Sequence, residues 1–127
     1  MEQNMKKITA IIWPHKRFKV MEALEAEEEF DGAIGSDARG NASEDDIQRM
    51  YPNSEGFISS LPKLKIELVV SDGAAERMAT AIRKAAHTGK TGDGLIVIEP
   101  IEEAVDIRTG KQYFAQTIIT DKRAALG

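Results

Sequence analysis

The sequence predicts an α+β fold, in which a four-stranded antiparallel sheet carries two helices on one face. A β-branched segment opens the chain, an alternating strand lies near its middle, and each is followed by a helical periodicity and a further strand. The resulting order is strand, helix, strand, long loop, strand, helix, strand. Two consecutive β-α-β units of this kind fit such a sheet. At 127 residues, one domain accounts for residues 1–127.

The first half of the chain supplies the first strand, the first helix and a weaker strand. Residues 8–13 are β-branched and aromatic and end at Pro14, which is typical of a buried strand. Residues 16–28 show helical spacing of apolar side chains, and the acidic residues 25–29 are expected to form the solvated end of that helix. Residues 32–40 form the weaker strand candidate.

The longest connection covers residues 41–57. This segment lacks periodicity and is rich in Asn, Ser, Asp, Glu, Gly and Pro. Connections of that length in a compact domain are usually functional or disordered. We therefore expect an exposed, flexible loop here.

The second half begins with the clearest strand, in which Leu64, Ile66, Leu68 and Val70 alternate with mostly polar residues. Ser71 or Asp72 is expected to cap the helix that follows, because either side chain can accept hydrogen bonds from free backbone amides. Small and apolar residues then recur at helical spacing, which suits a helix that lies close on a sheet. They are Ala75, Met78, Ala79, Ile82, Ala85 and Ala86.

A glycine-rich turn over residues 88–94 precedes the last strand, residues 95–98, which Pro100 ends. Ile11, Trp13 and Val69 fall on the register opposite the helix-facing side chains. The second face of the sheet is therefore not purely polar, and an oligomer that buries it is a reasonable expectation.

Composition excludes several functional classes. The 17 basic and 21 acidic residues give a net charge of −4, which argues against nucleic acid as a partner. The absence of cysteine excludes disulfides, thiolate metal sites and thiol catalysis. With only His15 and His87, neither a metal site nor a catalytic triad is expected. The apolar runs are too short for membrane insertion and no secretory signal is evident, so a cytoplasmic protein is expected.

The glycine turn is the most informative local motif. Its three glycines permit positive φ angles and close approach of a ligand to backbone amides, so the turn can cradle an anion. Arg108, just after the last strand, is able to make a bidentate phosphate contact. Each feature also has a plainer interpretation, a simple helix-to-strand turn and a lone surface arginine, and the residues alone leave both open.

Four blocks in order resemble the PII signal-transduction family. They are Lys-Lys-Ile-Thr-Ala-Ile-Ile-Trp-Pro-His-Lys at 6–16, Leu-Pro-Lys-Leu-Lys-Ile-Glu-Leu-Val-Val at 61–70, Thr-Gly-Lys-Thr-Gly-Asp-Gly at 88–94 and Ile-Arg-Thr-Gly at 107–110. The resemblance implies a homotrimer of ferredoxin-like subunits that bind adenine nucleotides (ADP, AMP or ATP) between neighbours. It also implies a regulator rather than an enzyme, with no tightly bound cofactor. Such a regulator moves its loop onto a target such as a membrane transporter or a metabolic enzyme.

By position, the resemblance assigns nucleotide-site residues on both sides of the loop and in the turn. Gly40 stands at the start of the loop and Lys63 at its end. The turn would supply backbone donors, and Lys63 and Arg108 would supply positive charge. The full set is Gly40, Lys63, Lys90, Gly92, Asp93, Gly94 and Arg108.

Three departures from the family pattern bear on the ligand. Leu95 stands where the family carries a lysine, and Asp106 where it carries the first of two arginines. Together these changes weaken phosphate binding by on the order of several kcal/mol unless they are compensated. Glu44 replaces a glutamine that helps to bind magnesium and 2-oxoglutarate. We therefore expect ADP or AMP to be preferred over ATP, and no sensing of 2-oxoglutarate.

The loop and the tail carry further expectations. Gly56 occupies the position of the tyrosine that many relatives uridylylate, so that modification is not expected, and Tyr51 is not at a modified position. Ser54 matches a serine that is phosphorylated in some photosynthetic relatives. Residues 111–127 extend past the usual end of the family and are apolar enough to pack, for example over the nucleotide cleft.

Two other functions remain open on the sequence. One is a PII-like protein of inorganic-carbon metabolism that responds to adenylates and bicarbonate. The other, from a different class, is a small ferredoxin-like phosphoryl-transfer enzyme that uses His87 beside the glycine turn. A trimeric metal-tolerance protein of similar fold is disfavoured because the chain has no cysteine and two histidines.

Overall fold

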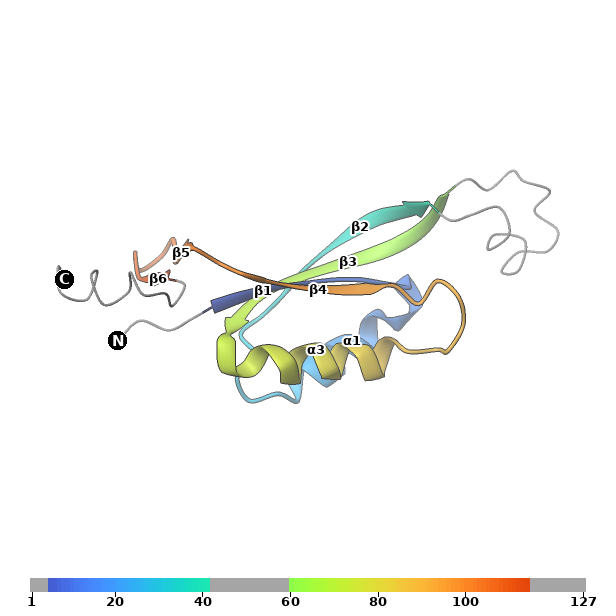
Figure 1. The fold of residues 1–127 in the computed structure, drawn as a ribbon, viewed down its shortest axis with the longest axis horizontal. Helices are drawn as coiled ribbons and strands as arrows, with labels where there is room; N and C mark the ends of the chain where they lie inside the picture. The colour runs from blue at the N-terminus through green and yellow to red at the C-terminus, as the bar shows by residue number, and fades with distance from the viewer. Residues whose placement is uncertain (1–4, 42–59, 115–127) are drawn as a thin grey trace.

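The computed structural model describes residues 5–41 and 60–114. Figure 1 shows β1 to β4 as one sheet with both helices against the same face, and β5 and β6 as a separate pair beyond one end of the sheet. The elements in chain order are β1 (Met5–Ile12), η1 (Pro14–Lys16), α1 (Arg17–Glu25), β2 (Ile34–Asn41), β3 (Ser60–Ser71), α3 (Asp72–Ala86), β4 (Leu95–Pro100), β5 (Glu103–Val105) and β6 (Gln112–Phe114).

The sheet has the strand order β2-β3-β1-β4, and all neighbouring strands are antiparallel. Ile8 of β1 lies opposite Leu68 of β3 on one side and Ile98 of β4 on the other. Together with the two helices on one face, this arrangement confirms the predicted ferredoxin-like α+β fold.

The core lies between the sheet and the helices. Alternate residues of β3 point inward, as the period of two predicted, and they meet the apolar stripes of α1 and α3. Alternate residues of β1 do so as well, whereas the sequence predicted a mostly buried strand there. Each fully buried Leu, Ile or Met side chain contributes about 1.5–3 kcal/mol. The largest fully buried side chains are Ile8, Ile12, Val20, Leu24, Ile66, Met78 and Ile82.

The opposite face of the sheet is partly apolar. Val69 of β3 is 45% exposed, and Ile34 of β2 is 70% exposed. Ile34 lies opposite Glu67, and Val69 opposite Lys7, so these apolar side chains share a face with the Lys7–Glu67 ion pair (2.9 Å). The expectation that this face is not purely polar is confirmed.

The first helix is shorter than the predicted span 16–28. A 3₁₀ turn, η1, precedes α1, and α1 ends at Glu25. Carboxylates oppose the dipole at a helix C-terminus, which favours ending the helix before the acidic stretch. Part of that stretch turns back to α3, where Arg77 contacts Glu27 (Nε–Oε1, 3.6 Å) and Glu29 (Nη2–Oε1, 3.1 Å). The interpretation of residues 25–29 as merely solvated is therefore incomplete.

The expected side-chain cap of α3 is wrong, although Ser71 does occupy the cap position. Its hydroxyl makes no cap hydrogen bond and instead donates to Glu29 Oε2 at 2.8 Å. Asp72 lies in the first turn of α3 and forms an ion pair with Lys6 (3.0 Å). The Ser71 hydroxyl thus donates to a carboxylate distant in sequence instead of accepting from the free amides of the helix.

The hairpin of β5 and β6 was not predicted. Asp106 organises its turn, since its carboxylate accepts from the Thr109 amide (2.9 Å) and its carbonyl from the Gly110 amide (2.8 Å). β6 lies within the expected extension 111–127, so the start of that extension pairs back onto the chain. Residues 115–127 lie outside the described residues.

The predicted loop 41–57 also lies outside the described residues, except for Asn41, which is the last residue of β2. The expectations attached to Glu44, Tyr51, Ser54 and Gly56 fall in this part of the chain.

Gly94, at the entry to β4, is a position that only glycine can occupy. Its φ is +116°, and a Cβ there would overlap the carbonyl oxygen of Ile11. We expect Gly94→Ala to lower the free energy of unfolding by at least about 3 kcal/mol, because the strained φ alone costs about 1–2 kcal/mol and the β1–β4 pairing must also shift. Denaturant unfolding followed by circular dichroism measures this change.

Gly73→Ala is the matched control. Gly73 lies in α3 with open space around its Cα, so alanine should raise stability by about 0.5–1 kcal/mol. Equal effects of the two substitutions would contradict the steric argument.

Candidate functional site

The candidate site lies where three segments meet at one end of the sheet. β1 ends there and leads to Trp13, β3 begins there with Lys63 near its start, and the turn 88–94 joins α3 to β4 beside them. In Figure 1 this is the end of the sheet from which β2 and β3 extend towards residues 42–59.

Lys63 is the centre of the site. Among the described residues it is the one charged residue that is buried, with 8% of its surface exposed. Its Nζ donates to the carbonyl oxygen of Gly92 and lies 3.4 Å from the centroid of the Trp13 ring. A carbonyl and an aromatic face both stabilise an ammonium group, so the two contacts compensate in part for its removal from water.

Gly40 leaves room for the lysine stem. A Cβ at Gly40 would lie 3.4 Å from Lys63 Cγ, at the last strand residues before the segment 42–59. The β2–β3 register places Gly40 opposite Leu61 and Ala38 opposite Lys63, so Lys63 lies against the strand that leads into that segment. The lysine therefore connects the start of residues 42–59 to the glycine turn.

Burial also sets the electrostatics of this lysine. Desolvation lowers the pKa of the Lys63 ammonium, and the nearby negative charge of Asp93 partly opposes this effect. A desolvated ammonium group interacts more strongly with an anion than a solvated one does, because little water screens the pair.

Asp93 holds the turn together from within. Its carboxylate accepts hydrogen bonds from the amides of Thr88 (2.8 Å) and Gly89 (2.9 Å), and also from the Thr88 hydroxyl. The amide of Lys90 in turn donates to Thr88 Oγ1 at 3.1 Å. Partial burial alone would raise the pKa of Asp93, but these hydrogen bonds and the neighbouring His87 lower it to about 2.

These contacts give Asp93 a structural role in the turn. The sequence predicted a turn whose backbone amides can cradle an anion. Three of these amides are in fact hydrogen-bonded inside the turn. The amides of Thr88 and Gly89 donate to the Asp93 carboxylate, and the amide of Lys90 donates to the Thr88 hydroxyl oxygen. Asp93 is thus a positioning residue that fixes the shape of the turn.

The structure brings most of the sequence-predicted site residues together. Lys63 bonds to Gly92 and lies next to Gly40, and Asp93 follows Gly92 within the same turn. Gly94 packs on β1, and the Lys90 side chain is exposed on the turn.

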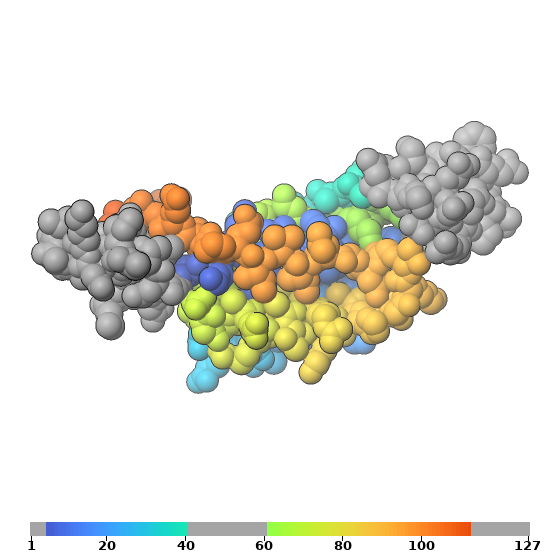
Figure 2. Space-filling model, in the orientation of Figure 1, coloured from blue at the N-terminus to red at the C-terminus, as the bar shows by residue number. Residues whose placement is uncertain are grey.

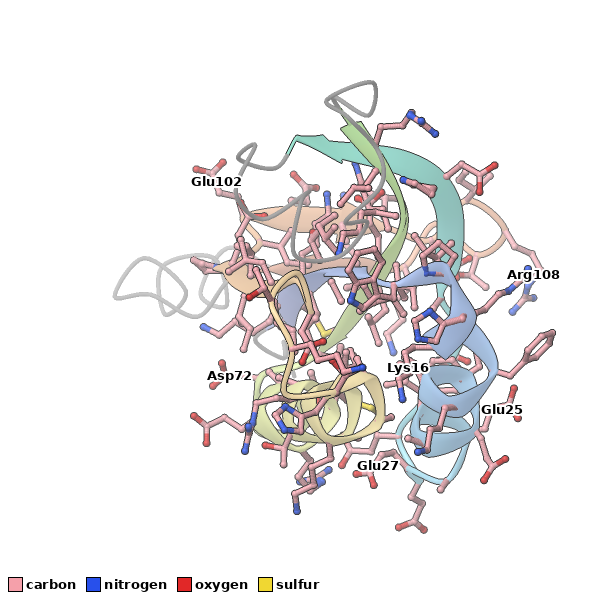
Figure 3. The ribbon with its side chains drawn as sticks, turned by 90° about the vertical axis from the view of Figure 1, so that its right-hand side faces the viewer. Lys16, Glu25, Glu27, Asp72, Glu102 and Arg108 are labelled. Atoms are coloured by element: carbon pink, nitrogen blue, oxygen red, sulfur yellow. The ribbon has the colours of Figure 1, made fainter. Side chains whose placement is uncertain are left out.

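Arg108 lies apart from the other candidates within one chain. It belongs to the turn between β5 and β6, at the opposite end of the sheet from the glycine turn, and its side chain projects outward (Figures 1 and 3). One subunit therefore does not assemble the complete predicted set.

Two residues of the site were not predicted. Trp13 was expected only on the second face of the sheet, and Thr88 only as part of the turn. The β1–β3 register pairs Ile12 with Leu64, which carries Trp13 alongside Lys63. Trp13 directly after a strand, on the face away from the helices, is the signal that pointed to it, although the sequence alone does not supply the register.

The other residues of interest are accounted for locally. Asp106 shapes the β5–β6 turn, where its carboxylate accepts from Thr109, and this hydrogen bond lowers its pKa. Leu95 is 64% exposed at the start of β4. His87 is exposed, with Nδ1 at 3.7 Å from Asp93 Oδ2. Over residues 5–41 and 60–114 no group of three His, Asp or Glu side chains is arranged to hold a metal ion.

The depressed pKa of Asp93 predicts a specific acid sensitivity. A carboxyl group with a folded pKa near 2 and an unfolded pKa of about 3.9 stabilises the fold above about pH 4, and this stabilisation is lost as the pH falls towards 2. We expect the native protein to lose roughly 2 kcal/mol over this interval through Asp93, and Asp93→Asn to remove that part of the pH dependence. Urea unfolding between pH 2 and pH 6 measures it.

Asp31→Asn is the control for general acid effects, since Asp31 is an exposed carboxylate outside the turn. Parallel pH curves for native protein and Asp93→Asn would show that the Thr88 and Gly89 hydrogen bonds do not stabilise the ionised form.

Comparison with known proteins shows which family has this sequence and fold. The family model described as Nitrogen regulatory protein P-II matches residues 5–111. A Nitrogen regulatory protein P-II of Azospirillum brasilense is 44% identical over 108 residues, 85% of this chain and 96% of the relative. One of Mesorhizobium japonicum is 46% identical over 107 residues, 84% and 95% of the two chains.

A solved structure agrees with this assignment. The structure titled "Crystal Structure of Arabidopsis thaliana PII bound to citrate" is similar with a TM-score of 0.68 and 27% identity, covering 87% of this chain and 89% of that one. The chain therefore belongs to the P-II family of nitrogen regulatory signal-transduction proteins.

Proposed function

We propose that this protein is a regulator that binds an adenine nucleotide beside Lys63 and the glycine turn, and that controls a partner protein through residues 42–59. The observation that carries the proposal is the buried Lys63 ammonium, which contacts the turn at Gly92 and lies next to Gly40. A nucleotide phosphate that engages Lys63 is then sensed where the segment 42–59 begins.

The chemistry of the site favours an anionic ligand. A lysine ammonium has three donors, and one of them is used on Gly92. A phosphate oxygen is a far stronger acceptor for a desolvated ammonium than a backbone carbonyl is. The related Arabidopsis protein is titled as bound to citrate, a polyanion, which agrees with an anion site in this fold.

A homotrimer would complete the site. The second face of the sheet exposes apolar side chains, and β4, orange in Figure 2, runs along the surface as an edge strand. Burial of these surfaces against neighbouring subunits would stabilise an oligomer. The same association is the way in which Arg108, remote from Lys63 in its own chain, would reach the nucleotide of a neighbour.

The ligand preference follows from charge. Leu95 brings no cation to the turn, and Asp106 adds an anion near Arg108. Both features weaken binding of a triphosphate more than binding of a mono- or diphosphate, so AMP or ADP is the favoured adenylate. Bicarbonate and 2-oxoglutarate are the two candidate second effectors to be compared. Glu44, in place of the glutamine that helps to bind 2-oxoglutarate in the family, favours bicarbonate.

Family membership also bears on the class of protein. The P-II family is named for regulation, which disfavours the alternative of a phosphoryl-transfer enzyme acting through His87. Within residues 5–41 and 60–114, no helix has both the length and the apolar character that a membrane crossing requires. We propose a cytoplasmic protein whose target is a membrane transporter or a metabolic enzyme.

Calorimetry with ADP, AMP and ATP tests the site through Lys63. We expect Lys63→Gln to weaken adenylate binding at least about ten-fold, equivalent to about 1.4 kcal/mol, since the buried cation is lost. Lys65→Gln is the matched control, because Lys65 lies two residues along the same strand and pairs with Glu67 (3.7 Å). Native binding by Lys63→Gln, or no binding of any adenylate by the native protein at millimolar concentration, contradicts the proposal.

A mixture of two defective chains tests whether the site is shared. If each site takes Lys63 from one subunit and Arg108 from the next, random trimers of Lys63→Gln and Arg108→Ala chains contain about one intact site in four. Each variant alone contains none. Recovery of native-affinity sites in the co-expressed mixture, counted by calorimetry, supports a shared site. The absence of recovery contradicts it.

A further inference from the structure

Six cations gather at the end of the molecule where α1 begins and α3 ends. We call this surface the basic end. η1 and the first turn of α1 supply three of the cations, and the last turn of α3 and the glycine turn supply the others. All are exposed except Lys16, which is half-buried and labelled in Figure 3. The six residues are Lys16, Arg17, Lys19, Arg83, Lys84 and Lys90.

The six cations of the basic end lack the acidic partners that four other cations of the described residues have. Lys6, Lys7, Lys65 and Arg77 all form ion pairs with Asp or Glu. None of the six cations of the basic end forms an ion pair with any residue in the described ranges. In a chain with a net charge of −4, six cations without an ion pair in the described ranges thus share one end, while Arg108 lies at the other (Figure 1).

Helix electrostatics do not account for this concentration. Arg83 and Lys84 lie in the last turn of α3, where the helix dipole favours cations. Arg17 and Lys19 lie in the first turn of α1, which has no acidic residue and where the dipole disfavours cations. The start of α1 therefore departs from the preference for acidic residues at a helix N-terminus, and no ion pair among the described residues offsets the cost. Such a departure is typical of a functional surface.

An exposed aromatic residue lies among these cations. Phe18 is 81% exposed, and the Arg17 guanidinium carbon lies 5.8 Å from the centroid of its ring. Exposed Phe flanked by Lys and Arg on a short helical segment is typical of protein surfaces that contact the headgroup region of a membrane.

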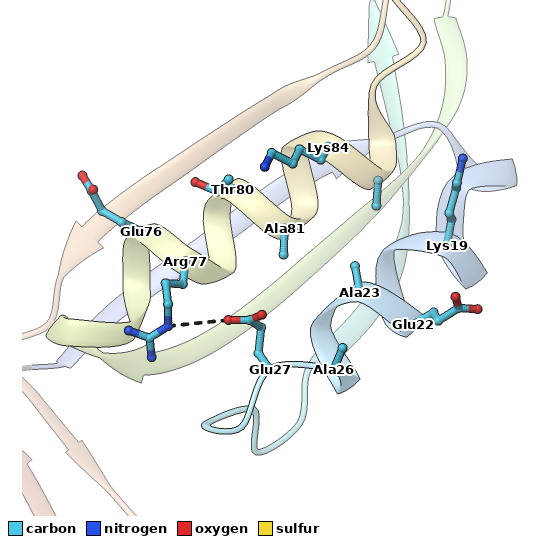
Figure 4. Close-up of a pocket in the computed structure, with 11 residues that line it drawn as sticks. Lys19, Glu22, Ala23, Ala26, Glu27, Glu76, Arg77, Thr80, Ala81 and Lys84 are labelled. Carbon is cyan, nitrogen blue, oxygen red and sulfur yellow. Dashed lines mark ion pairs between the residues drawn. The ribbon is translucent and has the colours of Figure 1, made fainter.

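The groove between α1 and α3 adds room for a headgroup. It has a volume of about 790 Å³ and is lined by alanines and by charged residues of both helices. Lys19 and Lys84 lie towards one end of it and the Arg77–Glu27 ion pair at the other (Figure 4). At the basic end the groove is thus flanked by Lys19 and Lys84, and Glu22, near Lys19, also lines it (Figure 4).

We propose that the basic end is a peripheral docking surface for a membrane that contains anionic lipid. Lys16, Arg17 and Lys19 engage lipid phosphates, and Phe18 enters the headgroup region. The six cations come from two helices and a turn, so they are spread over the surface and do not form one shaped pocket. A spread of positive charge suits the continuous negative charge of an anionic membrane better than it suits a single acidic protein segment. The docking requires neither a bound nucleotide nor a membrane-spanning segment.

Vesicle flotation with the full chain tests the proposal. The probes are vesicles of phosphatidylcholine alone and vesicles with about 30 mol% phosphatidylglycerol. We expect flotation only with the anionic vesicles, and its loss when NaCl is raised from about 0.05 M to about 0.5 M. Lys16→Gln/Lys19→Gln should lower the partition coefficient about ten-fold, and Phe18→Ala about three-fold.

Lys6→Gln/Lys65→Gln is the matched control, since it changes the net charge equally at ion-paired positions and should float as the native protein does. Circular dichroism of each variant confirms that the fold is intact. The proposal is overturned by equal flotation with neutral vesicles, by native flotation of Lys16→Gln/Lys19→Gln or of Phe18→Ala, or by no flotation of the native protein. The last result would leave an acidic protein as the partner that the basic end fits.

Discussion

The burial of one ammonium group constrains the end of the sheet that carries the candidate site. Lys63 is placed among the first residues of β3, where the β1–β3 register brings Trp13 alongside it and the turn after α3 brings the Gly92 carbonyl to its Nζ. A charge removed from water is tolerated only where such contacts compensate for the lost hydration. The positions of three segments far apart in sequence therefore depend on one another through this side chain.

Hydrogen bonds within the glycine turn fix its shape. Asp93 organises it from within, and Gly94 fixes its exit against Ile11. Because the turn is already ordered by these contacts, binding of a ligand there would need little free energy to order the backbone. An anion bound at Lys63, as proposed above, would share this ammonium group with the Gly92 carbonyl, since the group has three donors. Because Lys63 lies next to Gly40, the proposed ligand site and the start of the segment 42–59 are adjacent.

Residue patterns predicted the sheet, both helices and the core, because periodicities of 2 and 3.6 are local properties. The alternation from Leu64 to Val70 and the spacing of Met78 and Ile82 are examples, and both sets are buried. The hairpin of β5 and β6 was missed because three-residue strands carry too few residues for a period. The Ser71 hydroxyl was assigned to a local cap because the position of Glu29, 42 residues earlier, is a tertiary property. For the same reason, the sequence predicted Lys63 as a site residue only through its resemblance to the family, whereas its contact with Trp13 depends on strand register.

The net charge of the chain and the charge of its individual surfaces differ in this protein. A net charge of −4 excludes long-range attraction of the whole chain to a polyanion, but it says little about a surface of molecular dimensions. At physiological salt, charges separated by more than about 8 Å are largely screened from one another, so acidic residues elsewhere on the protein do not neutralise the basic end. Lys6, Lys7 and Arg77 are neutralised by direct neighbours, whereas Lys16 and Lys19 are not. Net charge therefore bears on the behaviour of the molecule at a distance, and the pairing of individual cations determines which of its surfaces is available to an anion.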